Sequence, residues 1–189
     1  MMNGYYTLLI IFLNYLIKHM NIVPEDIIEG TWERLSELSI EELDELVLRL
    51  SDEQPELFEY LTSNPENFTE NDSSFTLFMG LLIWLTLGQN GEKLPEVSWD
   101  VIEEKEDANY NSMAEMAEMM MKSEEEALLK ISDFYTSHHQ TELYGYIAAV
   151  LSPDEEEDMN DEESLAISDE SRAPIFLMLK TTLDCLDME

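Results

Sequence analysis

The chain has 189 residues, 43 acidic and 9 basic, with a formal net charge of −34 at pH 7. Its length fits one domain, and a hydrophobic content of 44% can build a core without a metal ion or a disulfide. The charge disfavours direct binding to DNA, RNA or anionic lipid, which needs Lys and Arg, and favours a basic protein partner. The single cysteine, Cys185, excludes an intramolecular disulfide and fits the reducing cytoplasm, where we expect the protein.

Residues 1–22 form an apolar N-terminal segment whose role the sequence leaves open. The run 5–17 is nearly all apolar, but as a helix it would rise only about 20 Å, short of the roughly 30 Å of a bilayer core. It also lacks the basic start and the small-residue cleavage site of a secretory signal. Three interpretations stay open: an extension upstream of a start at Met20, a helix packed on the core, and a membrane anchor or signal. We expect membrane contact only if residues 5–17 act as an anchor.

The next two segments predict amphipathic helices. Residues 24–38 begin with a proline, which the first helical turn tolerates, followed by two acids that favour a helix N-terminus. Ser39 and Glu42 then have the spacing of a capping box. The stripe behind them repeats at helical spacing and contains Ile40, Leu43, Leu46, Val47 and Leu50.

A short helix and a strongly apolar one follow. The short helix begins near Pro55, and a polar loop over 64–74 comes after it. Residues 75–87 are apolar on nearly every side, which predicts a buried helix. Gly80 in this helix costs about 1 kcal/mol relative to alanine, so we expect a neighbouring helix to approach closely there.

The second half of the chain repeats this helical character. Residues 98–122 predict a long helix, a capping box starts at Ser123, and a further helix covers 140–151. The stretch 153–170 is strongly acidic and predicts a solvated loop. The closing helix over 172–188 has a predicted buried face of Ile175, Phe176, Leu179, Leu183 and Leu186.

One motif occurs twice. Residues 54–61 read QPELFEYL and residues 140–147 read QTELYGYI, and each copy is followed by a polar insert and an apolar helix. Strict two-residue alternation of the kind that predicts strands is missing from the sequence. We therefore predict an all-α fold of two similar three-helix units, 39–87 and 123–188, packed about an approximate two-fold and joined by the 98–122 helix.

Within this fold, residues 23–188 form a single domain. The two apolar helices, 75–87 and 175–186, should face each other across the two units. The paired motif, with the Leu81-Leu82-Ile83-Trp84 helix between its copies, resembles an uncharacterised bacterial family of acidic, internally duplicated, all-helical proteins. The resemblance covers about residues 35–188. It implies the duplication and carries no assigned activity.

Candidate metal ligands are few. His138, His139 and Glu142 form the only constellation with metal-ligand spacing, but no acid stands three residues before either histidine, as a di-iron bundle requires. We therefore interpret both histidines as polar residues at a helix entrance. The acids of 154–163 lack the glycine of a calcium loop and predict at most weak cation binding. We expect no cofactor.

The lone thiol is interpreted as inert. Cys185 lies on the apolar side of the closing helix, and Asp184 and Asp187 flank it. A nucleophilic cysteine needs electropositive surroundings, whereas acids raise the thiol pKa.

Two features are candidates for interaction. The first is a methionine cluster on the 98–122 helix that includes Met113, Met116 and Met120; such side chains adapt to several partners, or else fill gaps in a core. The second is the repeated pair Gln54 with Tyr60 and Gln140 with Tyr146. The simpler interpretation of that pair is a capping glutamine and a packing tyrosine.

The sequence supports one main functional hypothesis and two alternatives. The main one is a non-enzymatic acidic helical protein that acts through contact with a basic protein or with itself. The first alternative is a mimic of nucleic acid that occupies a DNA-binding protein. The second is a metal protein or enzyme built around His138, His139 and nearby carboxylates.

Overall fold

The chain is all-helical in the part that the computed structural model describes, as predicted. The described residues are 22–63, 65, 67–89, 93–122, 138–152 and 167–187, and they contain helices and no strand. The first four helices are α2 (Glu25–Ser36), α3 (Ile40–Glu53), α4 (Pro55–Thr62) and α5 (Glu70–Leu87). They are followed by α6 (Trp99–Lys122), α8 (Thr141–Leu151) and α9 (Asp169–Leu186).

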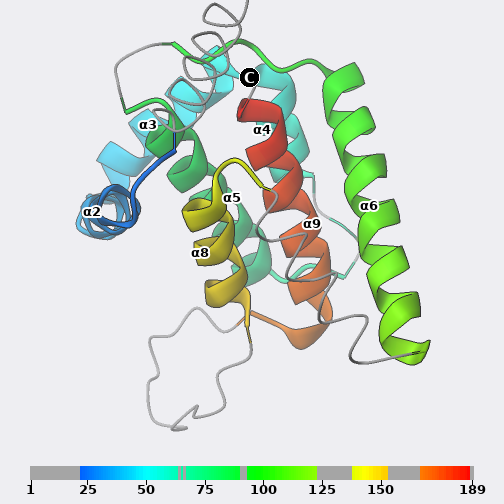
Figure 1. The fold of residues 1–189 in the computed structure, drawn as a ribbon. Coiled ribbons are helices and arrows are strands. Elements are labelled where there is room, and N and C mark those ends of the chain that lie inside the picture. The colour runs from blue at the N-terminus through cyan, green and yellow to red at the C-terminus, as the bar shows by residue number, and fades with distance from the viewer. Residues whose placement is uncertain are drawn as a thin grey trace, which may run out of the picture.

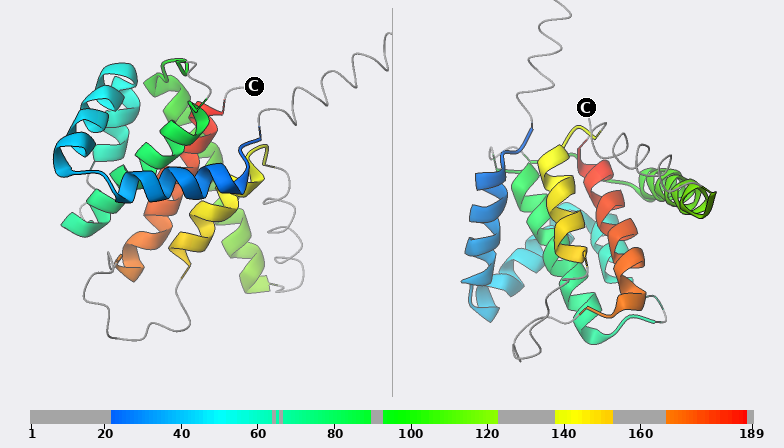
Figure 2. Two further views of the ribbon diagram at one scale, coloured as in Figure 1. Left: turned by 90° about the vertical axis from the view of Figure 1, so that its left-hand side faces the viewer. Right: turned by 60° about the horizontal axis from the view of Figure 1, so that its bottom comes forward.

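α5 and α9 pack against each other at the centre of the molecule, as the sequence predicts for its two apolar helices. α5 is apolar on nearly all sides because it contacts α2, α3 and α4 as well as α9. α9 is covered further by α6 and α8 (Figure 1). α2 crosses over α5 and α8 (Figure 2, left).

The N-termini of α5 and α9 meet at the buried carboxylate of Asp72. Thr69 and Asp72 form a capping box, with the Thr69 N–H donating to Asp72 at 2.8 Å. The same carboxylate accepts from the Ser168 N–H at 3.0 Å and from the Ser171 hydroxyl at 3.0 Å. Burial opposes ionisation, but these hydrogen bonds outweigh it and lower the pKa of Asp72 to about 2. One acid therefore stabilises the start of both central helices.

This cap corrects two predicted boundaries. α5 begins at Glu70, so the predicted polar loop 64–74 is too long. α9 begins at Asp169, so the predicted acidic loop 153–170 also ends too late. The start of α5 was missed because Thr-x-x-Asp is a weaker signal than the Ser-x-x-Glu pattern used for the other helices. The start of α9 was missed because its capping carboxylate, Asp72, lies on another helix.

Two local predictions are confirmed. Ser39 and Glu42 form the expected capping box at the start of α3. Gly80 permits the expected close approach, because a Cβ atom there would lie 2.5 Å from Leu61 Cδ1 on α4.

α6 is more than a connection between two units. Its Ile102 is buried, and Asn109 donates to Thr181 Oγ1 of α9 at 3.2 Å. It therefore forms part of the folded body alongside α9 (Figure 1).

Some predictions fall on parts of the chain that the structure does not describe. These are the N-terminal run 5–17, the capping box at Ser123 and most of the acidic loop, 153–166, which includes the weak calcium candidate. Within the described part of the chain, no helix combines the length and the apolar character needed to cross a membrane.

Candidate functional site

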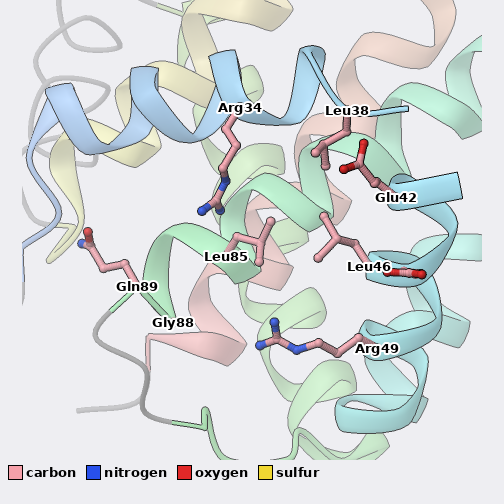
Figure 3. Close-up of a pocket in the computed structure, with 9 residues that line it drawn as sticks. Arg34, Leu38, Glu42, Leu46, Arg49, Leu85, Gly88 and Gln89 are labelled. Carbon is pink, nitrogen blue, oxygen red and sulfur yellow. The ribbon is translucent and has the colours of Figure 1, made fainter. Parts of the chain in front are cut away.

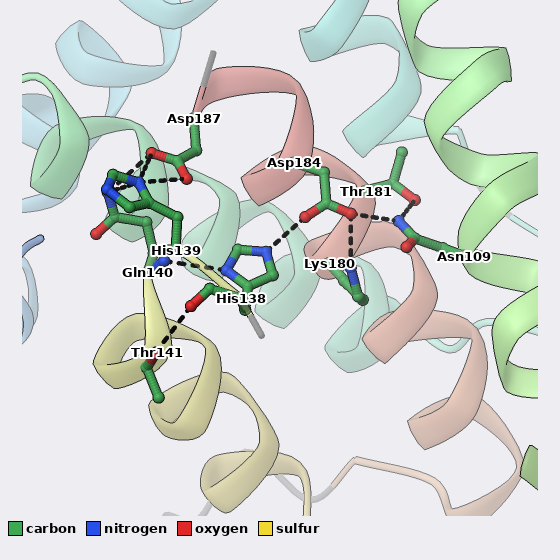
Figure 4. A network of polar contacts seen from close by, with 9 residues as sticks. All are labelled: Asn109, His138, His139, Gln140, Thr141, Lys180, Thr181, Asp184 and Asp187. Carbon is green, nitrogen blue, oxygen red and sulfur yellow. Dashed lines mark hydrogen bonds and ion pairs between the residues drawn. The ribbon is translucent and has the colours of Figure 1, made fainter. Parts of the chain in front are cut away.

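A polar network joins the entrance of α8 to the last turns of α9. His138 Nε2 lies 2.6 Å from Asp184 Oδ1, and the Gln140 N–H donates to His138 Nδ1 at 3.1 Å (Figure 4). Because Nδ1 accepts, the proton of the neutral ring is on Nε2 and is donated to Asp184. The imidazole also stacks on Tyr144, with ring centroids 5.2 Å apart.

Asp184 is the centre of this network. It accepts from Lys180 Nζ at 2.6 Å and from Asn109 Nδ2 at 2.8 Å, in addition to His138. Burial alone would raise the pKa of Asp184, but the His138 hydrogen bond and the Lys180 charge more than offset it, and the pKa is lowered. A buried lysine and a partly buried carboxylate thus neutralise each other, and the middle of α6, the start of α8 and the last turns of α9 are joined at one point.

His139 belongs to a second, separate cluster. Its Nδ1 lies 3.1 Å from Asp187 Oδ2, and Gln140 Nε2 donates to Asp187 Oδ1 at 2.8 Å (Figure 4). The two adjacent histidines therefore contact different aspartates. Glu142 is exposed and forms no hydrogen bond or ion pair with either ring.

The described residues around His138 and His139 do not form the metal site that the alternative hypothesis requires. Both ring nitrogens of His138 and the Nδ1 atom of His139 form hydrogen bonds within the protein, and Glu142 is in neither cluster. Among the described residues, no group of three or more His, Cys, Asp or Glu side chains is arranged to hold a metal ion. The hydrogen bonds of this network hold the start of α8 against the last turns of α9.

The two repeated glutamines occupy equivalent helix starts but do not cap them. Gln54 is the N-cap residue of α4 and Gln140 that of α8, and neither side chain bonds its own helix. Gln54 Oε1 accepts from the Val97 N–H at 2.8 Å, and its Nε2 donates to the Pro95 carbonyl at 2.8 Å. Gln140 Oε1 accepts from the Val23 N–H at 3.0 Å.

The predicted capping role of Gln54 and Gln140 is therefore wrong, although their positions are confirmed. Both side chains are buried, and each one fixes an extended segment that leads into another helix. Sequence reasoning could not identify these partners, because each lies more than 40 residues away in the chain.

The repeated tyrosines pack as expected. Tyr60 is buried, contacts Trp99 edge-on at 6.3 Å and donates to Glu106 at 2.7 Å. Burial first, and then Glu106, raise the pKa of Tyr60. Tyr146 is half-buried against Trp32 at 6.0 Å, and burial raises its pKa too. Gln54, Tyr60 and Gln140 are thus interior residues and are not available to a partner.

Cys185 is buried, as predicted. Burial and the neighbouring charge of Asp184 raise the pKa of its thiol to about 12. Its sulfur lies 4.0 Å from the Val101 carbonyl of α6. Such a thiol is a packing group and not a nucleophile.

The methionines of α6 lie outside the core. Met113 and Met116 are half-buried, and neither belongs to the main hydrophobic cluster of the described residues nor packs against it. Met120 and Met121 are 57% and 88% exposed, and Tyr110 on the same helix is 62% exposed. The interpretation as core filling is therefore wrong for Met120 and Met121.

Several residues of the network were missed by the sequence reasoning. Asp184 and Asp187 were noticed only as neighbours of the thiol, and Lys180 and Asn109 were not considered. A usable signal was present: a lysine four residues before an aspartate on an otherwise apolar helix predicts a buried ion pair.

Comparisons with known proteins identified no relative of this chain. No family model matches this chain, and neither a curated protein nor a solved structure was found to be similar to it.

Proposed function

We propose that this is a non-enzymatic, cytoplasmic protein that acts through protein–protein contact, and that the methionine-bearing face of α6 binds a basic partner segment. The observation that carries this proposal is the exposure of Met120 and Met121 on a long helix whose methionines do not enter the core. Flexible, polarisable methionine side chains can adapt to the shape of a partner.

The charge of α6 supports a basic partner. The helix has two basic residues, Lys105 and Lys122, against seven acidic ones: Asp100, Glu103, Glu104, Glu106, Asp107, Glu115 and Glu118. Carboxylates around an apolar strip attract a cationic partner and repel an anionic one. A basic amphipathic helix has both the charge and the apolar face that this surface would complement. Self-association through the same face is opposed by the net charge of −34.

The chemistry of the interior favours this function over catalysis. His138, Lys180 and Asp184 bond one another and hold helix ends, and Cys185 has a thiol pKa of about 12. These groups are used for stability in the described part of the chain. A catalytic acid, base or nucleophile needs access to a substrate.

We further propose that the chain consists of two related units packed about an approximate two-fold. The reciprocal glutamine contacts support this, because Gln54 binds the segment before α6 and Gln140 binds the segment before α2. The Asp72 carboxylate, which bonds the starts of both α5 and α9, supports it too. By this proposal α2 corresponds to α6, α4 to α8, and α5 to α9.

A calorimetric titration tests the proposed partner chemistry. The probe is an amphipathic helical peptide of lysine and leucine, and the control peptide has the same composition with leucines on all sides. We expect binding of the amphipathic peptide that weakens with salt. Replacing the exposed pair, Met120→Gln with Met121→Gln, should weaken it by about tenfold through lost apolar contact.

The matched control variant removes exposed apolar side chains from a different helix. Ile40 and Leu48 of α3 are 76% and 64% exposed, so Ile40→Gln with Leu48→Gln changes the same kind of surface. This variant should bind the peptide as the parent protein does. Equal binding of both peptides, or equal loss in both variants, would show that only non-specific charge attraction is at work.

A further inference from the structure

Two arginines line one groove of the protein. It lies between α2, α3 and α5 and encloses about 610 Å³, within the range of about 300–1,000 Å³ typical of small-molecule sites. Its apolar wall is formed by Leu38, Leu46 and Leu85, and Arg34 and Arg49 line it as well. Both guanidinium groups reach into this space, with Leu85 between them in the view of Figure 3.

Arginine is rare in this chain and is concentrated at this groove. The chain has 43 acidic residues and three arginines, and two of the three line this one cavity. Arginine is the side chain best suited to bind a carboxylate, because its planar group can donate two parallel hydrogen bonds.

The two guanidinium groups keep donors available. Arg34 forms no hydrogen bond or ion pair with any side chain that the structure describes. Arg49 Nε donates to Glu53 at 2.8 Å, and its guanidinium lies 4.7 Å from the centre of the Trp84 ring, which fixes its position. The bond to Glu53 uses the Nε atom and leaves the terminal nitrogens of Arg49 for another acceptor.

Two acids also line the groove. Glu42 is held by Ser39, which donates to it from both its N–H at 2.9 Å and its hydroxyl at 2.8 Å. Glu45 is the other acid of the lining. The formal charge of the lining is thus balanced within a protein that is otherwise strongly negative. What the lining offers a carboxylate is therefore the hydrogen-bond donors of the two arginines, without a net positive charge.

We propose that this groove binds a linear dicarboxylate, with one carboxylate at Arg34, the other at Arg49, and the apolar chain against the leucines between them. Two separated cations across an apolar wall fit a ligand with two anionic ends better than one with a single charged end. This site is separate from the α6 surface and does not depend on the proposed protein partner.

The test compares three ligands of similar length by NMR titration of the intact protein, following the arginine Nε–H signals. Suberate has two carboxylates, octanoate has one, and octylammonium has the opposite charge. A ligand of this size has an expected dissociation constant of about 1 mM. Suberate should bind about tenfold or more tightly than octanoate and shift the signals of both Arg34 and Arg49, and octylammonium should shift neither.

Charge-removing variants complete the test. Arg34→Gln and Arg49→Gln should each weaken suberate binding about tenfold, to the level of octanoate. Arg34→Gln is the cleaner variant, because Arg34 has no partner in the described structure whose loss would disturb the fold. Lys122→Gln is the matched control: it removes the same charge from an exposed site on α6 and should leave suberate binding unchanged.

Three results would overturn the proposal: no shift with millimolar suberate, octylammonium binding as well as suberate, or unchanged suberate binding by both arginine variants. An acidic peptide that shifts the same signals where suberate does not would likewise exclude the dicarboxylate and identify a peptide groove.

Discussion

Gln54 and Val97 are joined by a buried hydrogen bond of 2.8 Å between the glutamine Oε1 and the valine N–H. Val97 lies just before α6, and Gln54 lies at the start of α4, so this bond fixes where α6 begins against the body of the protein. Gln140 holds Val23, just before α2, through a bond of the same kind at 3.0 Å. Two segments that lead into helices thus each depend on one buried amide side chain.

Gln54→Leu tests this dependence. The variant leaves the Val97 N–H and the Pro95 carbonyl without their side-chain partner, and we expect it to lower the free energy of unfolding by about 2–4 kcal/mol. Urea denaturation measures the loss, and hydrogen exchange should be faster at Val97 while Val23 stays protected. The exposed Gln89 gives the control Gln89→Leu, which should be near neutral. Unchanged protection of Val97 in the variant would show that the bond is not needed.

Asp72→Ala should destabilise both central helices. Each lost N-cap costs about 1 kcal/mol, and this side chain serves two helix starts while buried, so we expect a loss of about 2–4 kcal/mol. Thermal or urea unfolding measures it. Asp44→Asn, at an exposed position of α3, is the control and should change little.

The pH dependence of the same variant follows from the lowered pKa. Asp72 has a pKa of about 2 in the folded protein against about 3.9 in an unfolded chain. The stabilisation is therefore fully present above the unfolded value and is lost as the pH falls toward the folded one. The stability difference between the parent protein and Asp72→Ala should shrink from pH 5 to pH 2. A difference that stays constant over this range would contradict an ionised Asp72 as the cap.

Gly80→Ala should be destabilising even though alanine is the better helix former. Its Cβ would meet Leu61 Cδ1 at 2.5 Å, and Leu61 is buried and cannot move away freely. Overpacking should lower the free energy of unfolding by about 1–3 kcal/mol, and the better helix propensity of alanine should restore about 1 kcal/mol. The net decrease is therefore up to about 2 kcal/mol. Gly30→Ala on α2, where a Cβ meets nothing within 4 Å, should instead be stabilising. Equal effects of the two substitutions would exclude the predicted clash.

The helices and their packing could be predicted from the sequence to the extent that local signals determine them. The Ser39 capping box and the all-round apolar character of α5 depend on neighbouring residues in the chain, and both are confirmed. The glycine at position 80 predicted a close approach, which is confirmed, but not that Leu61 of α4 makes it. The glutamine contacts and the contacts of Asp72 with the start of α9 were not predicted, because their partners are distant in sequence. The Arg34 and Arg49 groove was missed for the same reason, since three separate helices form it.

Cys185 should react slowly with thiol reagents in the native protein. With a thiol pKa of about 12 and a buried side chain, almost no thiolate is present at pH 8. We expect labelling by a chromogenic disulfide reagent to be at least about a hundredfold slower than in urea. The protein unfolded in urea is its own control, because Cys185 is the only cysteine. Rapid labelling of the folded protein would mean that the thiol is accessible and activated.

The most direct measurement of the proposed function uses methyl-labelled methionine and NMR titration with the basic amphipathic peptide. Our account predicts that the methyl signals of the exposed Met120 and Met121 shift on binding, while those of the buried Met79 and Met178 stay in place. Peptide binding that leaves the α6 methionines unshifted, or that shifts buried and exposed methionines alike, would contradict α6 as the contact surface.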